Sequence, residues 1–242
     1  MGSQPLSKPA GRRLGLVVAL AVEAKALGLP ASPMGKVHSC TGGHLAVLSG
    51  MGPEAAAEAG RALLAAGAEA LLSVGTAGAL RGDLQAGDLC IPRKILWREA
   101  AYSADEALAS HFLAQHPQAR REDLLSLAQM LVDRQSKTAY AQQALAVDME
   151  SGALAALAKA EGVPFLALRV IVDSVDAVVP DAVRFGVDAV GTPRLPGFLW
   201  QLLRRPQDLP RLLRLGGQMQ RAAATLRQLR SEWESGELRC GH

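Results

Sequence analysis

Between residues 14 and 173, continuous apolar runs alternate with segments of helical pattern. Four runs have the character of strands covered on both faces: LGLVVALA (14–21), HLAVLSG (44–50), ALLSVG (70–75) and VPFLALRVIVD (163–173). Shorter strands are predicted at 88–96 and 144–149, and helices at 51–67, 106–116, 137–145 and 151–162. Strands separated by helices of this length form βαβ units, so the pattern predicts one α/β domain with a mixed, mainly parallel central sheet flanked by helices.

The two ends of the chain depart from this alternation. Residues 1–13 are polar and are predicted to be a mobile tail, and residues 14–191 to be the main, catalytic domain. Residues 192–242 are predicted to be a helical extension of the same domain. Within this extension, residues 198–230 carry seven arginines and leucines at helical spacing. Two interpretations stay open: a segment that lies on a membrane surface, or a helix packed on the domain with a solvated basic face.

Composition narrows the class of protein. Hydrophobic residues make up 49% and charged residues 20% of the 242, which is typical of a globular chain. Aromatic residues are only 4% and the net charge is +3, which argues against nucleic-acid binding. The three cysteines form no CxxC pair, which favours a reducing compartment and gives no indication of a metal site. We therefore expect a cytoplasmic protein, with peripheral contact at the inner membrane through 198–230 as the open alternative.

Polar residues follow four of the predicted strands. They are Glu23 after the first, Thr76 within the stretch Gly75-Thr76-Ala77-Gly78 after 70–74, Asp148 and Glu150 after 144–147, and Asp173 and Asp176 after 163–172. Ligands of such sheets bind beyond the carboxyl ends of the strands, so we expect these residues to converge on one site. Each also has a plain structural interpretation: Glu23 can begin a helix, GTAG can be a tight turn, and Asp148 can cap the helix 151–162. Their co-location is what indicates an enzyme.

Four segments also resemble a known motif series in order and spacing. VALAVEA (18–24), SVGTAGAL (73–80), AVDMESGALA (146–155) and VPFLALRVIVDSVD (163–176) resemble the superfamily of purine nucleoside phosphorylases and methylthioadenosine/S-adenosylhomocysteine nucleosidases. The end of the chain, RRPQDLPRLLRLGGQMQRAAATLRQL (204–229), is similar to that of the hopanoid-associated phosphorylases, bacterial proteins implicated in removing adenine from adenosylhopane.

The resemblance implies a nucleoside phosphorylase-like fold and cleavage of the N-glycosidic bond of an adenine nucleoside. It implies a homo-oligomer, and neither a metal nor an organic cofactor. The implied substrate is lipid-linked adenosylhopane. One alternative is a soluble small nucleoside, methylthioadenosine or S-adenosylhomocysteine, and another is a non-catalytic nucleoside- or lipid-binding protein.

Roles for individual residues follow from the same resemblance. It places Asp173 as the acid that protonates the departing purine, with Thr76 holding its carboxyl group. Glu150 accepts hydrogen bonds from the ribose hydroxyls, and Met149 lies under the sugar. Glu23 positions and deprotonates a water molecule.

The nucleophile stays open at this point. Phosphorylases of the superfamily hold phosphate with arginines, and the position of one of them is Ser73 here, so the local pattern resembles a hydrolase while the subfamily implies phosphorolysis. Phosphate as a co-substrate can still be bound by Ser73, Thr76 and the N–H groups of the glycine-rich stretch. Arg169, within a strand, fits a structural role as well as a catalytic one. The stretch 101–146, where the nucleosidases place part of the purine pocket, is poorly matched.

Overall fold

The structure is a computed structural model. It describes residues 12–30, 33–40, 43–175 and 209–235, with the side chains of 214–230 in the last range. Most of the predicted tail 1–13, the end of the domain 14–191 and residues 192–208 of the extension lie outside the described residues.

In the described part of the chain, the core is one mixed sheet of ten strands. Eight strands follow the order β2 (Val37–Ser39), β3 (Leu45–Leu48), β1 (Leu14–Val18), β4 (Ala70–Ala79), β9 (Ala146–Asp148), β8 (Leu124–Ser126), β6 (Lys94–Trp97) and β7 (Ala100–Ser103). Off this path, β10 (Phe165–Asp173) pairs with β4 and with β5 (Leu89–Cys90). The pairs β1–β3, β1–β4, β4–β10, β6–β8 and β8–β9 are parallel, which confirms the mixed, mainly parallel sheet.

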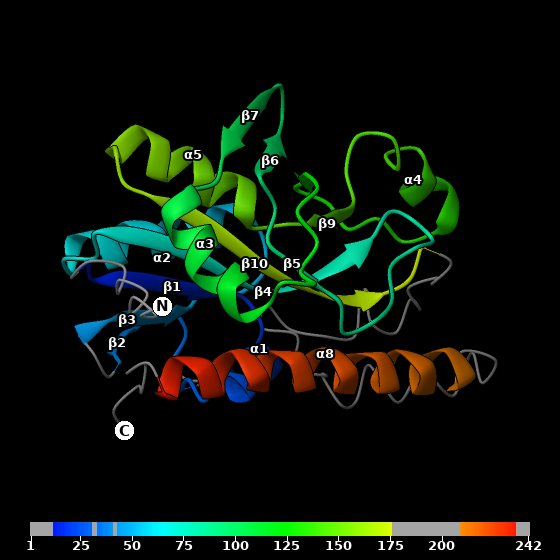
Figure 1. The fold of residues 1–242 in the computed structure, drawn as a ribbon, viewed down its shortest axis with the longest axis horizontal. Helices are drawn as coiled ribbons and strands as arrows, with labels where there is room; N and C mark the ends of the chain where they lie inside the picture. Colours follow the sequence, from blue (N-terminus) through cyan, green and yellow to red (C-terminus); the bar gives the residue numbers. More distant parts are fainter. Residues whose placement is uncertain (1–11, 31–32, 41–42, 176–208, 236–242) are drawn as a thin grey trace, which may run out of the picture.

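Helices cover both faces of the sheet (Figure 1). One apolar core joins the sheet to α1 (Ala21–Ala26), α3 (Glu106–Gln115) and α8 (Leu209–Ser235). The other joins it to α2 (Pro53–Ala65) and α5 (Ser151–Glu161). Each face of the sheet is therefore buried, as the uninterrupted apolar runs predicted.

The long strand β4 positions the site. Along one side it pairs with β10 up to Gly78. On its other side it pairs with β1 over residues 70–73 and with β9 only at 78–79. Because β1 runs parallel to β4 and β9 runs antiparallel to it, the carboxyl ends of β1 and β9 face each other beside residues 74–77. A crevice of this kind, where neighbouring strands diverge, is where open α/β sheets bind ligands.

Several local predictions were wrong. Of the two interpretations left open for GTAG, the tight turn does not hold: the stretch is part of β4, because β10 continues to pair with it. The single strand predicted at 88–96 is divided into β5 and β6, and the helix predicted at 137–145 is the short α4 (Arg134–Thr138) followed by turns. The sequence interpretation also missed the short strands β2, β7 and β8, whose three or four residues give little periodic signal.

The described part of α8 is a packed helix. Ala222, Ala223, Leu226 and Leu229 are buried against the sheet and α1, while Arg221 and Arg227 are exposed. This supports the interpretation of residues 214–230 as a helix on the domain with a solvated basic face. Among the described helices, none has both the length and the apolar character that crossing a membrane requires.

Candidate active site

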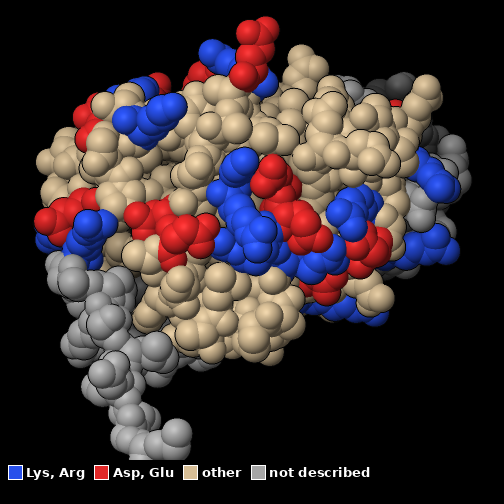
Figure 2. Space-filling view, turned by 45° about the horizontal axis from the view of Figure 1, so that its top comes forward, with Lys and Arg blue, Asp and Glu red and all other residues tan. Residues whose placement is uncertain are grey.

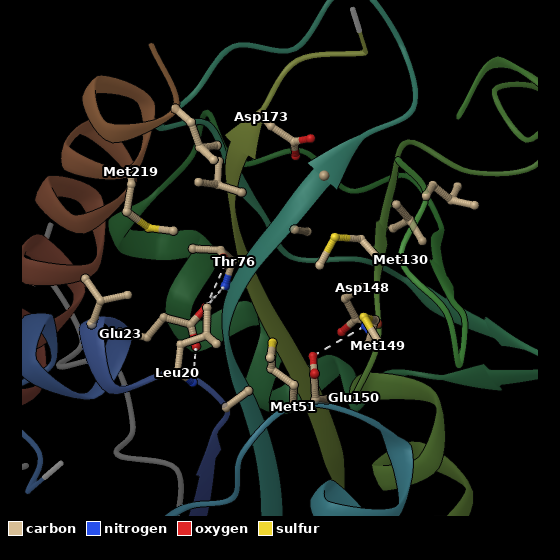
Figure 3. A pocket seen from close by; sticks show the side chains of 18 of the residues that line it. Leu20, Glu23, Met51, Thr76, Met130, Asp148, Met149, Glu150, Asp173 and Met219 are labelled. Carbon is tan, nitrogen blue, oxygen red and sulfur yellow. Dashed lines mark hydrogen bonds between the residues drawn. The ribbon is translucent and has the colours of Figure 1, made fainter. Parts of the chain in front are cut away.

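A cavity of about 250 Å³ opens beside β4 where β1 and β9 end (Figure 3). Its lining includes six of the eight residues predicted for the site: Glu23, Thr76, Gly78, Met149, Glu150 and Asp173. Figure 3 shows Asp173 at one end of the cavity and Glu150 at the other. The structure thus brings together side chains that lie up to 150 positions apart in the chain.

Glu23 is held at the carboxyl end of β1 by three hydrogen bonds. The backbone N–H and the hydroxyl of Thr76 both donate to its Oε1 atom at 2.7 Å, and the N–H of Leu20 donates to Oε2 at 3.0 Å. A carboxylate has about four acceptor positions, so with the described residues placed one position remains for a ligand. Burial raises the pKa of Glu23 above its ordinary value, although the bonds from Thr76 oppose this. A buried carboxylate with a raised pKa is a stronger base once it ionises.

Thr76 therefore holds Glu23, and the prediction that it holds Asp173 is wrong. Thr76 lies on β4 opposite Val170, whereas Asp173 is opposite Gly78, two positions further on. The hydroxyl of Thr76 has one hydrogen, and it donates this hydrogen to Oε1 of Glu23. The sequence motif thus identified Thr76 correctly as a residue of the site, but its carboxylate partner is Glu23 and not Asp173.

Arg169 is the buried centre of the site. Its side chain is 1% exposed, and its Nη2 atom lies 2.6 Å from Oδ2 of Asp148 and 3.8 Å from Oε2 of Glu150. The same atom donates to the hydroxyls of Ser73 at 2.6 Å and Ser151 at 3.0 Å. One guanidinium thus compensates several buried carboxylates, a function that the sequence interpretation left undecided.

Ser73 and Gly75 support this arginine and do not line the cavity. Ser73 is fully buried and accepts a hydrogen bond from Arg169, so the expectation that it contacts substrate or phosphate does not fit the structure. At Gly75, an added Cβ would lie 2.6 Å from Nη1 of Arg169 and 2.8 Å from Oε2 of Glu23. Glycine at this position is what lets the two charged groups approach the strand.

Glu150 and Asp148 divide their roles at the end of β9. Glu150 accepts from the N–H groups of Gly52 at 3.0 Å and Met149 at 3.3 Å, which among the described residues leaves about two acceptor positions free. Burial raises the pKa of Glu150 to about 7; Arg169 lowers it and Asp148 raises it further. Asp148 accepts from the N–H of Ser151, the first residue of α5, at 3.1 Å, but the N-cap residue of this helix is Glu150, so Asp148 is not the cap that the sequence predicted.

Asp173, at the far end of the cavity, is paired with a lysine. Lys137 of α4 donates to Oδ2 of Asp173 and, at 3.0 Å, to the backbone carbonyl of Ser174. Burial raises the pKa of Asp173, and the neighbouring ammonium acts against that rise. Lys137 is 1% exposed and lines the cavity. Sequence reasoning missed it, because a lone lysine in the poorly matched stretch 101–146 carries no recognisable signal.

The remaining lining of the cavity is mostly apolar. Four of the six methionines of the chain lie on it: Met51, Met130, Met149 and Met219. Met219 and Leu215 belong to α8, so the C-terminal extension contributes to the site and is not a mere appendage. Methionine side chains are flexible and polarizable, and they suit an apolar ligand group of variable shape.

Away from the cavity, charges of both signs are mixed. Acidic and basic side chains are interspersed on the face drawn in Figure 2. Asp83, for example, lies 2.9 Å from both Arg81 and Arg120. This face therefore does not present the continuous basic surface that nucleic-acid binding uses.

The chain matches the family model described as Phosphorylase superfamily over residues 34–133 and 115–190. A search of curated protein sequences found no match. Among solved structures, a mutant of the Helicobacter pylori 5′-methylthioadenosine/S-adenosylhomocysteine nucleosidase with 5′-methylthioadenosine in its active site is similar, with TM-score 0.61 and 18% identity over 91% of this chain and 99% of that chain.

Two further solved structures share the fold. Futalosine hydrolase of Helicobacter pylori has a TM-score of 0.59 and 19% identity, covering 82% of this chain and 100% of its own. A putative methylthioadenosine nucleosidase from Weissella paramesenteroides has a TM-score of 0.58 and 20% identity, covering 90% and 98%. At such identities, the likeness establishes the architecture of this chain.

Proposed function

Because this chain belongs to the phosphorylase superfamily, we propose that it cleaves the N-glycosidic bond of an adenine nucleoside, and that it does so by hydrolysis. The observation that carries the proposal is the shared cavity. Glu23, Glu150 and Asp173 come from three different strand ends and line one space. Cleavage of this bond needs a group for the nucleophile, a group for the sugar and a group for the departing base, and three carboxylates at separate places can supply them.

The chemistry sets the task of each group. As the bond between C1′ and the purine breaks, positive charge develops on the sugar and negative charge on the base. Glu150 has acceptor positions free for the two vicinal ribose hydroxyls, with the thioether of Met149 beside the sugar. At the opposite end of the cavity, Asp173 and its lysine partner hold a transferable proton next to the base. No metal ion or organic cofactor takes part in this scheme.

Water is the proposed nucleophile, and the charges favour it over phosphate. Four carboxylates line the cavity, those of Glu23, Asp148, Glu150 and Asp173, against one ammonium group, that of Lys137, and among the described residues no arginine lines it. The guanidinium of Arg169 lies behind the lining and is bonded to Asp148. A phosphate dianion would enter against this negative charge. The donors of Thr76, which would suit an anion, are already bonded to Glu23.

Glu23 is the proposed base for that water. One acceptor position on its carboxylate remains free, and its raised pKa makes it a better proton acceptor near neutral pH than an exposed glutamate. The proton of the attacking water passes to Glu23 as the hydroxyl oxygen bonds to C1′. The three bonds that fix the carboxylate keep it in place for this step.

The finer proposal concerns the 5′ substituent, for which adenosylhopane is the favoured substrate. The sequence resemblance of residues 204–229 supports it, and so does the methionine-rich lining. The cavity of about 250 Å³ is at the small end for ligand sites, so it would enclose the nucleoside while a hopane chain extended outside. The same volume suits methylthioadenosine, the 5′-methylthio nucleoside bound by the structural relative from Helicobacter pylori, which makes this compound the second candidate.

The test is release of free adenine from adenosylhopane, methylthioadenosine, S-adenosylhomocysteine and adenosine. We expect Glu23→Gln to lower kcat by about 10²-fold or more with every substrate that the wild type cleaves. Glu58→Gln is the matched control, because Glu58 is exposed on α2, away from the cavity. A wild-type protein that binds these nucleosides and releases no adenine would show that the proposal is wrong. The order of kcat/KM values among the four compounds decides the 5′ substituent.

A further inference from the structure

Lys137 is a buried cation that lines the cavity beside Asp173. Burying an ammonium group is costly unless it is paired. Lys137 is paired with Asp173, so the pair as a whole is neutral. An isolated pair of this kind contributes little to stability compared with apolar residues of the same volume. A lysine whose amine reaches the base end of a ligand cavity therefore calls for a functional explanation.

The ammonium group of Lys137 has one N–H donor without an acceptor among the described residues. A lysine ammonium carries three N–H donors. Within the described part of the chain, two of them have acceptors, Oδ2 of Asp173 and the carbonyl oxygen of Ser174. The third is available to the cavity that Lys137 lines. The base end of the cavity thus presents a donor, the lysine, beside an acceptor, the carboxylate of Asp173.

This donor–acceptor pair matches one edge of adenine. On that edge, adenine offers an acceptor at N7 and a donor at the 6-amino group, whereas a 6-oxopurine offers two acceptors. Resting on the proposed function, we propose that Lys137 is a catalytic residue that donates to N7 of the departing adenine, while Asp173 orients Lys137 and accepts from the 6-amino group. The pair therefore both protonates the leaving base and selects adenine over 6-oxopurines.

In this step, the glycosidic bond breaks and one proton reaches the departing base. The bond between C1′ and N9 breaks, and its electron pair moves into the purine ring. N7 takes the proton from the lysine amine, and the carboxylate of Asp173 stays ionised. Water supplies the hydroxyl group at C1′, and its proton passes to Glu23 and returns through solvent to the lysine. The products are free adenine and the sugar.

The alternative is that Lys137 only neutralises a carboxylate that acts alone as the acid. The two assignments predict opposite results for substitutions of the pair. If Lys137 is the donor, its loss affects only substrates whose leaving group needs protonation. If Asp173 is the only acid, Asp173→Asn lowers cleavage of adenosine and inosine by the same factor. If Asp173 instead reads the 6-amino group, asparagine at 173 can donate its amide N–H to the 6-oxo group and the preference shifts.

The experiment measures kcat/KM of wild type, Lys137→Met and Asp173→Asn with adenosine, inosine and 4-nitrophenyl β-D-ribofuranoside, whose leaving group departs without protonation. Lys94→Met is the matched control, because Lys94 is exposed on β6 and does not line the cavity. We expect Lys137→Met to lose about 10²-fold or more on adenosine and to keep wild-type turnover of the nitrophenyl riboside. We expect Asp173→Asn to shift the inosine-to-adenosine ratio of kcat/KM upward by about tenfold.

Two outcomes overturn the inference while the proposed function stands. One is cleavage of adenosine by Lys137→Met at the wild-type rate. The other is an equal loss in Lys137→Met on adenosine and the nitrophenyl riboside, with an unchanged inosine-to-adenosine ratio in Asp173→Asn. A wild-type protein that cleaves no purine nucleoside overturns the proposed function itself, so the two failures are distinguishable. Circular dichroism and thermal unfolding of each variant show whether a loss of turnover comes from a loss of fold.

Discussion

Replacing Glu150 with glutamine should make the protein's stability depend on pH in a way that can be calculated. Glu150 is 8% exposed, and burial raises its pKa from the ordinary 4.5 to about 7. Glutamine has the same shape, and its carbonyl oxygen can accept the 3.0 Å bond from the N–H of Gly52, whereas the longer bond from Met149 to the other oxygen is lost. The substitution therefore removes the titration and preserves most of the packing.

The sign and the size of this pH dependence follow from the linkage between proton binding and folding. A carboxyl group whose pKa is higher in the folded protein binds more protons there than in the unfolded chain, so its contribution to stability is full below pH 4.5 and is lost as the pH rises through about 7. The interval from 4.5 to about 7, at roughly 1.4 kcal/mol per pH unit, corresponds to about 3 kcal/mol. The wild type should lose this amount from acid to mildly alkaline pH, and the Glu150→Gln variant should not.

The assay is urea unfolding of wild type and Glu150→Gln at about pH 4 and about pH 8, the two ends of the titration. From the lower to the higher pH, we expect the unfolding free energy of the variant to rise by about 3 kcal/mol relative to that of the wild type. Glu58→Gln, on the exposed side of α2, should keep a constant difference. A difference in unfolding free energy between wild type and Glu150→Gln that stays constant from acid to alkaline pH would show that the pKa of Glu150 does not change on folding.

Two other substitutions test how the site is held. Thr76→Val removes the hydroxyl that donates to Glu23 at 2.7 Å, and since this bond lowers the pKa of Glu23, the acid limb of the pH–rate profile should move to higher pH; an unmoved limb would contradict the assigned bond. Gly78→Ala would place a Cβ 2.8 Å from Oδ1 of Asp173, so kcat should fall. Gly82→Ala is the control, because its added Cβ meets no described atom within 4 Å, and it should match the wild type. Equal activity of the two variants would count against the placement of Asp173.

The convergence of the strand ends could be predicted from the sequence for a physical reason. Strands covered on both faces appear as uninterrupted apolar runs, and the first polar residue after each run marks its carboxyl end. Glu23 was found in this way, and so was Asp148, with Glu150 two residues after it. Because neighbouring strands in an α/β sheet deliver such ends to one crevice, the cavity could be expected before its walls were known.

The pairing of the charged groups could not be predicted. Whether Thr76 bonds Glu23 or Asp173 depends on the register of β4 against β10, which no local pattern encodes. Arg169 looks like any arginine in a strand until Ser73, Ser151 and Asp148 are seen around it. These contacts join segments far apart in the chain.

The contributions of α4 and α8 were missed for a different reason. Lys137 lies in a helix of five residues, too short to give a periodic signal. Met219 lies on a helix whose pattern indicated a basic extension, and only its packing brings this residue to the cavity. Short elements and docked helices are positioned by tertiary packing, which overrides local preference.

Identifying the sugar product formed from adenosine in the presence of phosphate decides whether water or phosphate attacks C1′. If water activated by Glu23 attacks, each molecule of adenine released is accompanied by one of free ribose, and Glu23→Gln releases both about 10²-fold or more slowly. Ribose 1-phosphate as the sugar product, or free ribose released equally fast by Glu23→Gln, would show that the proposed nucleophile or its base is wrong.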